Sequence, residues 1–156
     1  MIFDETNEFA DAESVANSAG TYNLGDVIDL SVVRDMGQGH PVYLVITVDT
    51  EIITGGAAGT IQFQLVSDAV TTPNTSTATK HFLTPTFVTD DANANDPQLN
   101  AGGVICVQPL PVEGHEYERY LGVQYTIGTT TTTAGNVNAF LTLDPYGWKS
   151  YPDATN

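Results

Sequence analysis

Several segments of the chain alternate between apolar and polar residues with a period of two, the pattern of half-buried β-strands. The clearest runs from Thr60 to Ser67 and places three apolar side chains on one face: Ile61, Phe63 and Leu65. Gln62 and Gln64 fall on the other face, which we expect to point outward. Both faces of residues 42–48 are apolar. This strand is therefore predicted to be central or covered on both sides.

Turn residues separate further strands predicted at residues 26–30, 87–89, 104–107, 116–127 and 136–144. Helical periodicity is poor, although residues 9–19 are compatible with a short helix and residues 77–80 with a single helical turn. Residues 129–133 predict a hairpin loop whose threonines extend the flanking strands. We therefore expect an all-β protein: a jelly-roll-like antiparallel β-sandwich of about eight strands, forming a single domain over residues 1–156.

Charge excludes two classes of partner. The 156 residues include four basic and 19 acidic ones, for a net charge of −15. Phosphate backbones and anionic lipid surfaces repel such a chain, so we expect neither nucleic-acid nor membrane binding. No apolar stretch approaches the ~18 residues of a membrane span. The opening residues 1–5 carry neither a basic leader nor an apolar signal core, which predicts synthesis in a cytoplasm without a cleaved signal.

A search for catalytic patterns finds none. Cys106 lies in an apolar run, which favours a small buried hydrophobe over a nucleophile. The three histidines are isolated, with no metal-ligand spacing. Residues 90–96 begin like a calcium loop but carry Asp96 where glycine belongs and Gly102 where the final glutamate belongs. We therefore predict no enzyme activity and no catalytic, cofactor or metal site.

The two ends of the chain carry candidate interface residues. Apolar or aromatic side chains interrupt otherwise polar terminal segments at six positions: Ile2, Phe3, Phe9, Tyr146, Trp148 and Tyr151. Short segments with aromatic anchors suit docking onto a neighbouring subunit or a larger surface, and equally suit folding back over an open end of the sandwich. Arg119 is the seventh candidate, a charge within a predicted strand. We expect it to pair with an acid, in the fold or across an interface.

The order and spacing of six segments resemble the capsid cement (decoration, head-stabilisation) proteins of tailed phages with a jelly-roll fold. These segments lie along nearly the whole chain, at residues 1–4 with 9–12, 26–30, 39–48, 118–125, 135–141 and 148–153. The chain departs from the resemblance in a longer insert at residues 84–100 and in the threonine-rich loop.

The resemblance implies a non-enzymatic structural virion protein on the outer surface of a capsid. Its partners would be the major capsid protein and further copies of itself in a small homo-oligomer, a dimer or a trimer. It would clamp neighbouring capsomers against the internal pressure of packaged DNA. The alternative that we retain is a carbohydrate-binding jelly-roll module, because seven tyrosines and one tryptophan are enough for a sugar platform.

Overall fold

The computed structural model describes residues 5–31, 39–55, 59–89, 96–112 and 114–145. Those residues form nine strands and two short 3₁₀ helices and contain no α-helix. In chain order the elements are η1 (Glu5–Asn7), β1 (Glu8–Ser14), β2 (Gly20–Asp29), β3 (Tyr43–Thr54), β4 (Thr60–Asp68), β5 (Thr79–Leu83), β6 (Phe87–Val88), η2 (Pro97–Leu99), β7 (Val104–Pro109), β8 (Tyr120–Gly128) and β9 (Thr132–Thr142).

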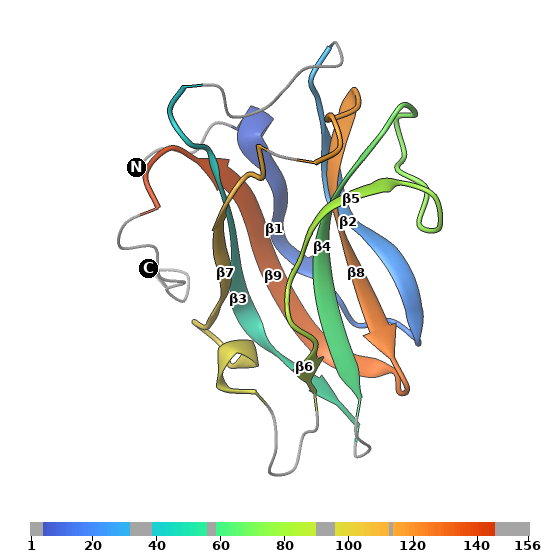
Figure 1. Cartoon of the computed structure of the whole chain (residues 1–156). Helices are drawn as coiled ribbons and strands as arrows, with labels where there is room; N and C mark the ends of the chain where they lie inside the picture. The colour runs from blue at the N-terminus through green and yellow to red at the C-terminus, as the bar shows by residue number, and fades with distance from the viewer. Residues whose placement is uncertain (1–4, 32–38, 56–58, 90–95, 113, 146–156) are drawn as a thin grey trace.

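The strands form two antiparallel sheets that pack face to face as a sandwich (Figure 1). Sheet A has the order β1-β9-β3-β7, and sheet B has the order β2-β8-β4-β5, with β6 also paired to β4. The pairs nest: β1 pairs with β9, β2 with β8, β3 with β7 and β4 with β5. A long hairpin rolled onto itself gives this order, so the topology is a jelly roll, as expected from the sequence.

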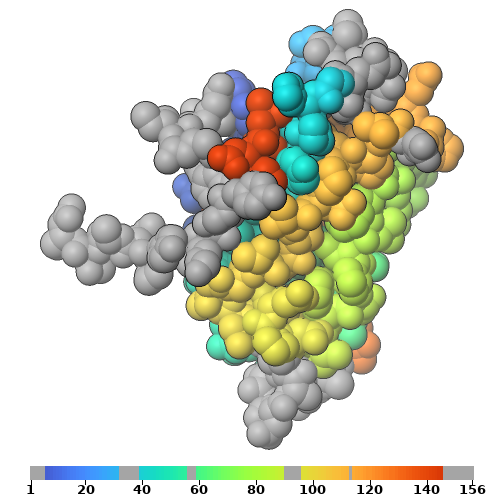
Figure 2. Space-filling model, turned by 60° about the vertical axis from the view of Figure 1, so that its left-hand side comes forward, coloured from blue at the N-terminus to red at the C-terminus, as the bar shows by residue number. Residues whose placement is uncertain are grey.

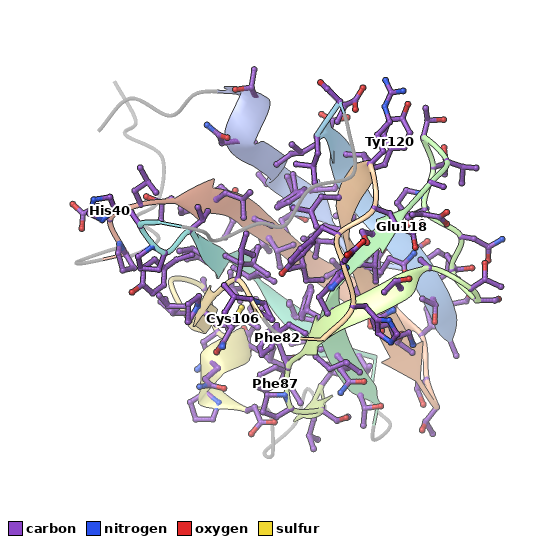
Figure 3. All side chains as sticks on the ribbon, turned by 45° about the horizontal axis from the view of Figure 1, so that its top comes forward. His40, Phe82, Phe87, Cys106, Glu118 and Tyr120 are labelled. Carbon is purple, nitrogen blue, oxygen red and sulfur yellow. The ribbon has the colours of Figure 1, made fainter. Side chains whose placement is uncertain are left out.

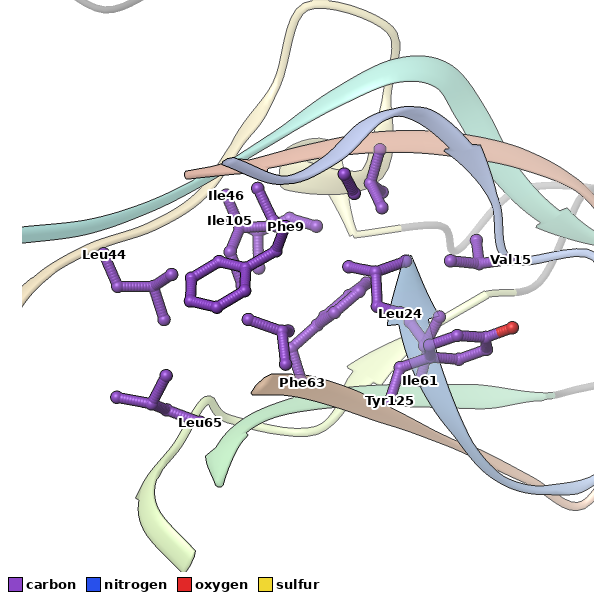
Figure 4. Close-up of a cluster of buried hydrophobic side chains, with 14 of the residues drawn as sticks. Phe9, Val15, Leu24, Leu44, Ile46, Ile61, Phe63, Leu65, Ile105 and Tyr125 are labelled. Carbon is purple, nitrogen blue, oxygen red and sulfur yellow. The ribbon is translucent and has the colours of Figure 1, made fainter. Parts of the chain in front are cut away.

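The core lies between the sheets and is built from the apolar face of each strand (Figure 4). Ile61, Phe63 and Leu65 of β4 are at most 1% exposed, as the alternation predicts. The central position predicted for residues 42–48 is also confirmed, since β3 lies between β9 and β7. Full burial of side chains of this size contributes about 1.5–3 kcal/mol each, which makes this interior the main stabilising term.

A polar layer covers the outer face of sheet B. Gln64 was expected to point to solvent, but it is 3% exposed. Its amide donates to Gln124 at 3.0 Å, and the Gln124 amide donates to Asn23 at 2.9 Å. The Asn23 amide in turn donates to the Pro73 carbonyl, so the loop at residues 69–78 closes over the amides. Gln64 does face outward; the covering loop is what buries it.

Two local predictions of helix are wrong. Residues 8–14 form strand β1 instead of the start of a helix, because the strand pairs with β9 through two register shifts that disturb its alternation. The positive φ of Ala12, 49°, lies within this irregular stretch. The helical turn expected at residues 77–80 falls slightly earlier, where the Ala78 amide donates to the Asn74 carbonyl, and Lys80 already belongs to β5. Residues 97–99 form the 3₁₀ helix η2.

The crossing from β1 to β2 depends on Gly25. Its φ is +53°, and a Cβ built there would lie 2.0 Å from the backbone carbonyl oxygen of Phe9. Only glycine lets the two strands approach this closely, because any other residue adds a carbon where the Phe9 carbonyl already lies.

We expect Gly25→Ala to lower the free energy of unfolding by at least about 3 kcal/mol, since backbone strain and a backbone clash combine. Gly114→Ala is the matched control: its φ of +108° is also positive, but no atom lies within 4 Å of the added Cβ. The control should lose only about 1 kcal/mol in denaturant unfolding. Equal losses of unfolding free energy in the two variants would show that the close approach to the Phe9 carbonyl does not add to the cost of the substitution.

Candidate docking surface

Both ends of the described chain leave sheet A at one corner. Glu8 opens β1 and pairs with Phe140 of β9, and β9 ends two residues later at Thr142. Adjacent strands are ~4.8 Å apart, so the two exits are neighbours. This follows from the jelly roll, in which the first and last strands pair antiparallel. The terminal segments with the predicted anchors therefore begin side by side.

The outer face of sheet A has an apolar centre close to this corner. Val45 of β3 pairs with Phe140 of β9, and both point away from the sheet that faces them across the core. Neither belongs to the core cluster, yet they are only 0% and 4% exposed. Val107 of β7, also paired with Val45, is 41% exposed. An apolar row thus runs across three strands on the outside of the sandwich.

The predicted anchors divide into two groups. Phe9 is 1% exposed and belongs to the core, where it holds β1 against the opposite sheet (Figure 4). Its side chain therefore stabilises the fold and presents no docking surface. The other five terminal candidates lie outside the described residues, and their role as anchors stays a prediction: Ile2, Phe3, Tyr146, Trp148 and Tyr151.

Arg119 pairs with an acid within the fold, as expected. Its Nε and Nη2 donate to the two carboxylate oxygens of Asp29, each at 2.9 Å, which is the bidentate geometry that arginine favours. Its guanidinium carbon also lies 5.0 Å from the ring centre of Tyr120. The predicted strand position is wrong, because β8 begins at Tyr120 and the Arg119 side chain is 47% exposed. The pair joins the end of β2 to the entry of β8.

The two flanks of the sandwich differ in charge. On one flank, β1 and β2 carry five acidic residues and no basic one: Glu8, Asp11, Glu13, Asp26 and Asp29. On the other flank, β5, β6 and β7 carry no acidic residue and include Lys80. Figure 2 shows β7 beside the β5–β6 segment on the molecular surface. Figure 3 places Cys106, Phe82 and Phe87 close together between these strands. Two carboxylates still lie against this second flank: Glu118 accepts a hydrogen bond from Thr79, and Asp96 accepts one from the Val88 amide.

A serine–histidine pair lies beside this flank and was not anticipated from the sequence. Ser67 Oγ and His81 Nε2 are 2.7 Å apart, and the His81 ring stacks on Tyr117 at 4.0 Å between centres. Ser67 is 0% exposed and also accepts a hydrogen bond from the Glu118 amide. A buried hydroxyl fixed in this way is unsuited to nucleophilic attack. The pair instead fastens β5 and the entry of β8 to β4.

The surroundings of the single cysteine keep its thiol protonated. Burial raises the pKa of the Cys106 thiol to about 12, so the thiol stays protonated at neutral pH. No three histidine, cysteine or acidic side chains of the described ranges are grouped to hold a metal ion. Five residues of the proposed calcium loop, Asp91–Asn95, and Asp90 before them lie outside those ranges. Within the described part of the chain, no helix is long and apolar enough to cross a membrane.

A sugar platform finds little support among the tyrosines that the structure describes. Tyr117 and Tyr125 are at most 2% exposed, and the remaining three, Tyr22, Tyr43 and Tyr120, are half-buried. The Tyr125 hydroxyl accepts from the Asn17 amide, and its ring stacks on Tyr22 at 5.5 Å. These rings are engaged within the fold, whereas sugar binding needs an open aromatic face.

The fold and the surface together define an acidic jelly-roll domain, a fold used by viral capsid proteins and lectins alike. Comparison with protein-family models identifies the family. The Bbp16 family model matches residues 9–141, so the chain belongs to the Bbp16 family, which is a family of phage proteins. No curated protein matches the chain.

The Asp29–Arg119 pair predicts an altered titration. The hydrogen bond from Arg119, followed by that from the Ser31 amide, lowers the pKa of Asp29 from 3.8 to about 2. The pair therefore contributes stability above pH 3.8, and the contribution is lost as the pH falls toward 2. Arg119→Gln should move the Asp29 pKa toward, but not fully to, its ordinary value, because the Ser31 amide remains. Carboxyl NMR titration measures this shift, with Lys80→Gln as the control that leaves it unchanged.

The lowered pKa of His81 leads us to expect that the stability of the fold depends on pH near neutrality. Burial, with a smaller effect of His115, lowers the pKa of His81 below 6.5, while Glu118 opposes the shift. The unfolded chain thus binds this proton more readily, so the contribution is complete above pH 6.5 and is lost as the pH falls. Urea unfolding between pH 7.5 and 5.5 should show a smaller loss of stability for His81→Gln than for the unaltered protein. His40→Gln, at a distant exposed site (Figure 3), should keep the original dependence; an unchanged slope in His81→Gln would refute the assignment.

Proposed function

We propose that the protein is a non-enzymatic structural component of a phage virion that binds the outer surface of the capsid and clamps neighbouring capsomers. The observation that carries this proposal is Bbp16 family membership over residues 9–141 together with the jelly-roll topology. The partner is the major capsid protein, and the protein acts as a small homo-oligomer, a dimer or a trimer. It is synthesised in the host cytoplasm and then added to the virion.

The shape of the surface supports this proposal. Two terminal segments with predicted anchors start at one corner of sheet A, so they are placed to reach across a joint together. The strands β5, β6 and β7 carry no acidic residue, so their flank repels a negatively charged partner less than the flank of β1 and β2 does. Each clamp need only be weak, because hundreds of copies act on one shell and their contributions add. The net charge of −15 keeps decorated particles apart from one another.

Co-sedimentation with capsids tests the proposal. The purified protein is mixed with expanded and unexpanded shells of its major capsid protein that lack it. We expect saturable binding and shells that survive higher temperature or pressure. The copy number at saturation then identifies the symmetry position of the clamp. Absence of binding to both shells would contradict the proposal and would favour the carbohydrate-binding alternative, which a glycan array examines directly.

A separate variant tests the predicted C-terminal anchors in the same assay. Replacing Tyr146, Trp148 and Tyr151 together by serine should weaken shell binding at least tenfold, since buried aromatic anchors dominate most interfaces. Thr129→Ser, in the exposed β8–β9 turn, is the control and should bind as the unaltered protein does. Full binding by the triple variant would show that the three C-terminal aromatic side chains do not contribute to the interface.

A further inference from the structure

The two sheets present four edge strands, and their edges are not equally protected. The edges are β1 and β7 in sheet A, and β2 and the β5–β6 line in sheet B. An open edge exposes unpaired backbone N–H and C=O groups, which other extended chains can pair with. Proteins protect such edges with charges, prolines, bulges and short strands.

Three of the four edges carry such protection. β1 has two register shifts together with exposed Asp11 and Glu13. β2 has a register shift after Leu24 and an exposed Asp26, and it packs beside β1. The third edge carries Lys80 in β5 and is broken by Pro85 before β6 begins. Each of these devices disfavours the addition of another strand.

β7 is the edge that carries no charge. Its sequence, Val104 to Pro109, holds no charged residue. Its register shift lies between Val104 and Cys106 and its proline is the last residue, so its only protection lies towards its two ends. Val107 stands at its middle with 41% of its surface exposed, and it continues the apolar row of Val45 and Phe140. The ladder of β7 runs to β3, on one side of the strand. Figure 2 shows β7 at the molecular surface.

We propose that β7 is a strand-addition site that takes an extended segment of the capsid shell protein. Antiparallel or parallel addition there would extend sheet A by a fifth strand, with main-chain hydrogen bonds giving affinity. Side chains at alternate positions of the incoming segment would be apolar, to cover Val107. The rest of that segment would be neutral or basic, because this chain carries a net charge of −15.

A shell segment fits this edge better than a second copy does. Six residues of edge strand bury far less than the ~1,600 Å² typical of stable complexes between free proteins. A second copy would also bring a further net charge of −15 against this edge, which disfavours a homo-oligomer contact at β7 in particular. On a shell, the small area buried at β7 is supplemented, because the terminal segments and many further copies bind the same surface. The inference thus rests on the proposed function and specifies how the partner is recognised.

The test compares two exposed apolar residues on opposite edges. Val107→Lys places a charge on the uncharged β7 edge. Leu83→Lys places one on the β5 edge, where Leu83 is 46% exposed, close to the 41% of Val107. Both variants are first checked for an unchanged midpoint of thermal unfolding. We expect Val107→Lys to lower the affinity for expanded shells at least tenfold and Leu83→Lys to bind as the unaltered protein does. Equal binding by all three proteins would overturn the inference and leave the proposed function standing.

Hydrogen exchange provides an independent measurement on the unaltered protein. Amides of residues 104–109 should exchange more slowly when the protein is bound to shells, because a new strand engages those that face outward. Unchanged exchange in β7 in the bound state would also overturn the inference. Failure of the unaltered protein to bind shells would instead refute the proposed function, and the strand-addition site with it.

Discussion

The antiparallel pairing of β1 with β9 is the constraint on which the rest of the structure depends. It joins the first and last strands, and the pairs β2–β8, β3–β7 and β4–β5 nest inside it. Because these contacts are distant in sequence, the two ends must meet before the roll closes. The same pairing sets Glu8 against Phe140 and so brings both chain exits to one corner. The corner that we propose for docking is therefore a by-product of closing the fold.

Charge is distributed in a way that complements this topology. β1 and β2 carry five carboxylates, and one of these, that of Asp29, is paired with Arg119. The opposite flank carries none in its strands. An approaching macromolecule of neutral or positive charge thus meets fewer carboxylates on that flank, where Glu118 accepts a hydrogen bond from Thr79 and Asp96 accepts one from the Val88 amide.

Local periodicity predicted most of the fold but not what depends on distant contacts. The β4 core residues and the central place of β3 follow from alternation alone. The periodicity did not predict strand β1, because its register shifts break the alternation and leave Phe9 and Ala12 at a spacing that also suits a helix. The burial of Gln64 depends on Pro73 from a covering loop, and Asp29 lies 90 residues from its partner Arg119. The weakness of the β7 edge emerges only once the strand order is known, since an apolar run suits a central strand equally well.

The uncharged edge of β7 and the net negative charge of the whole chain bear on the same question, namely which chain can pair with this edge. Left alone, the uncharged edge of β7 would favour pairing with any extended chain, including another copy. The net charge of −15 disfavours pairing of two copies through this edge, which its register shift and Pro109 protect only in part. Repulsion of this kind vanishes when the partner is neutral and reverses when it is basic. In our proposal, the net charge and the uncharged edge together favour a neutral or basic strand over a second copy at β7.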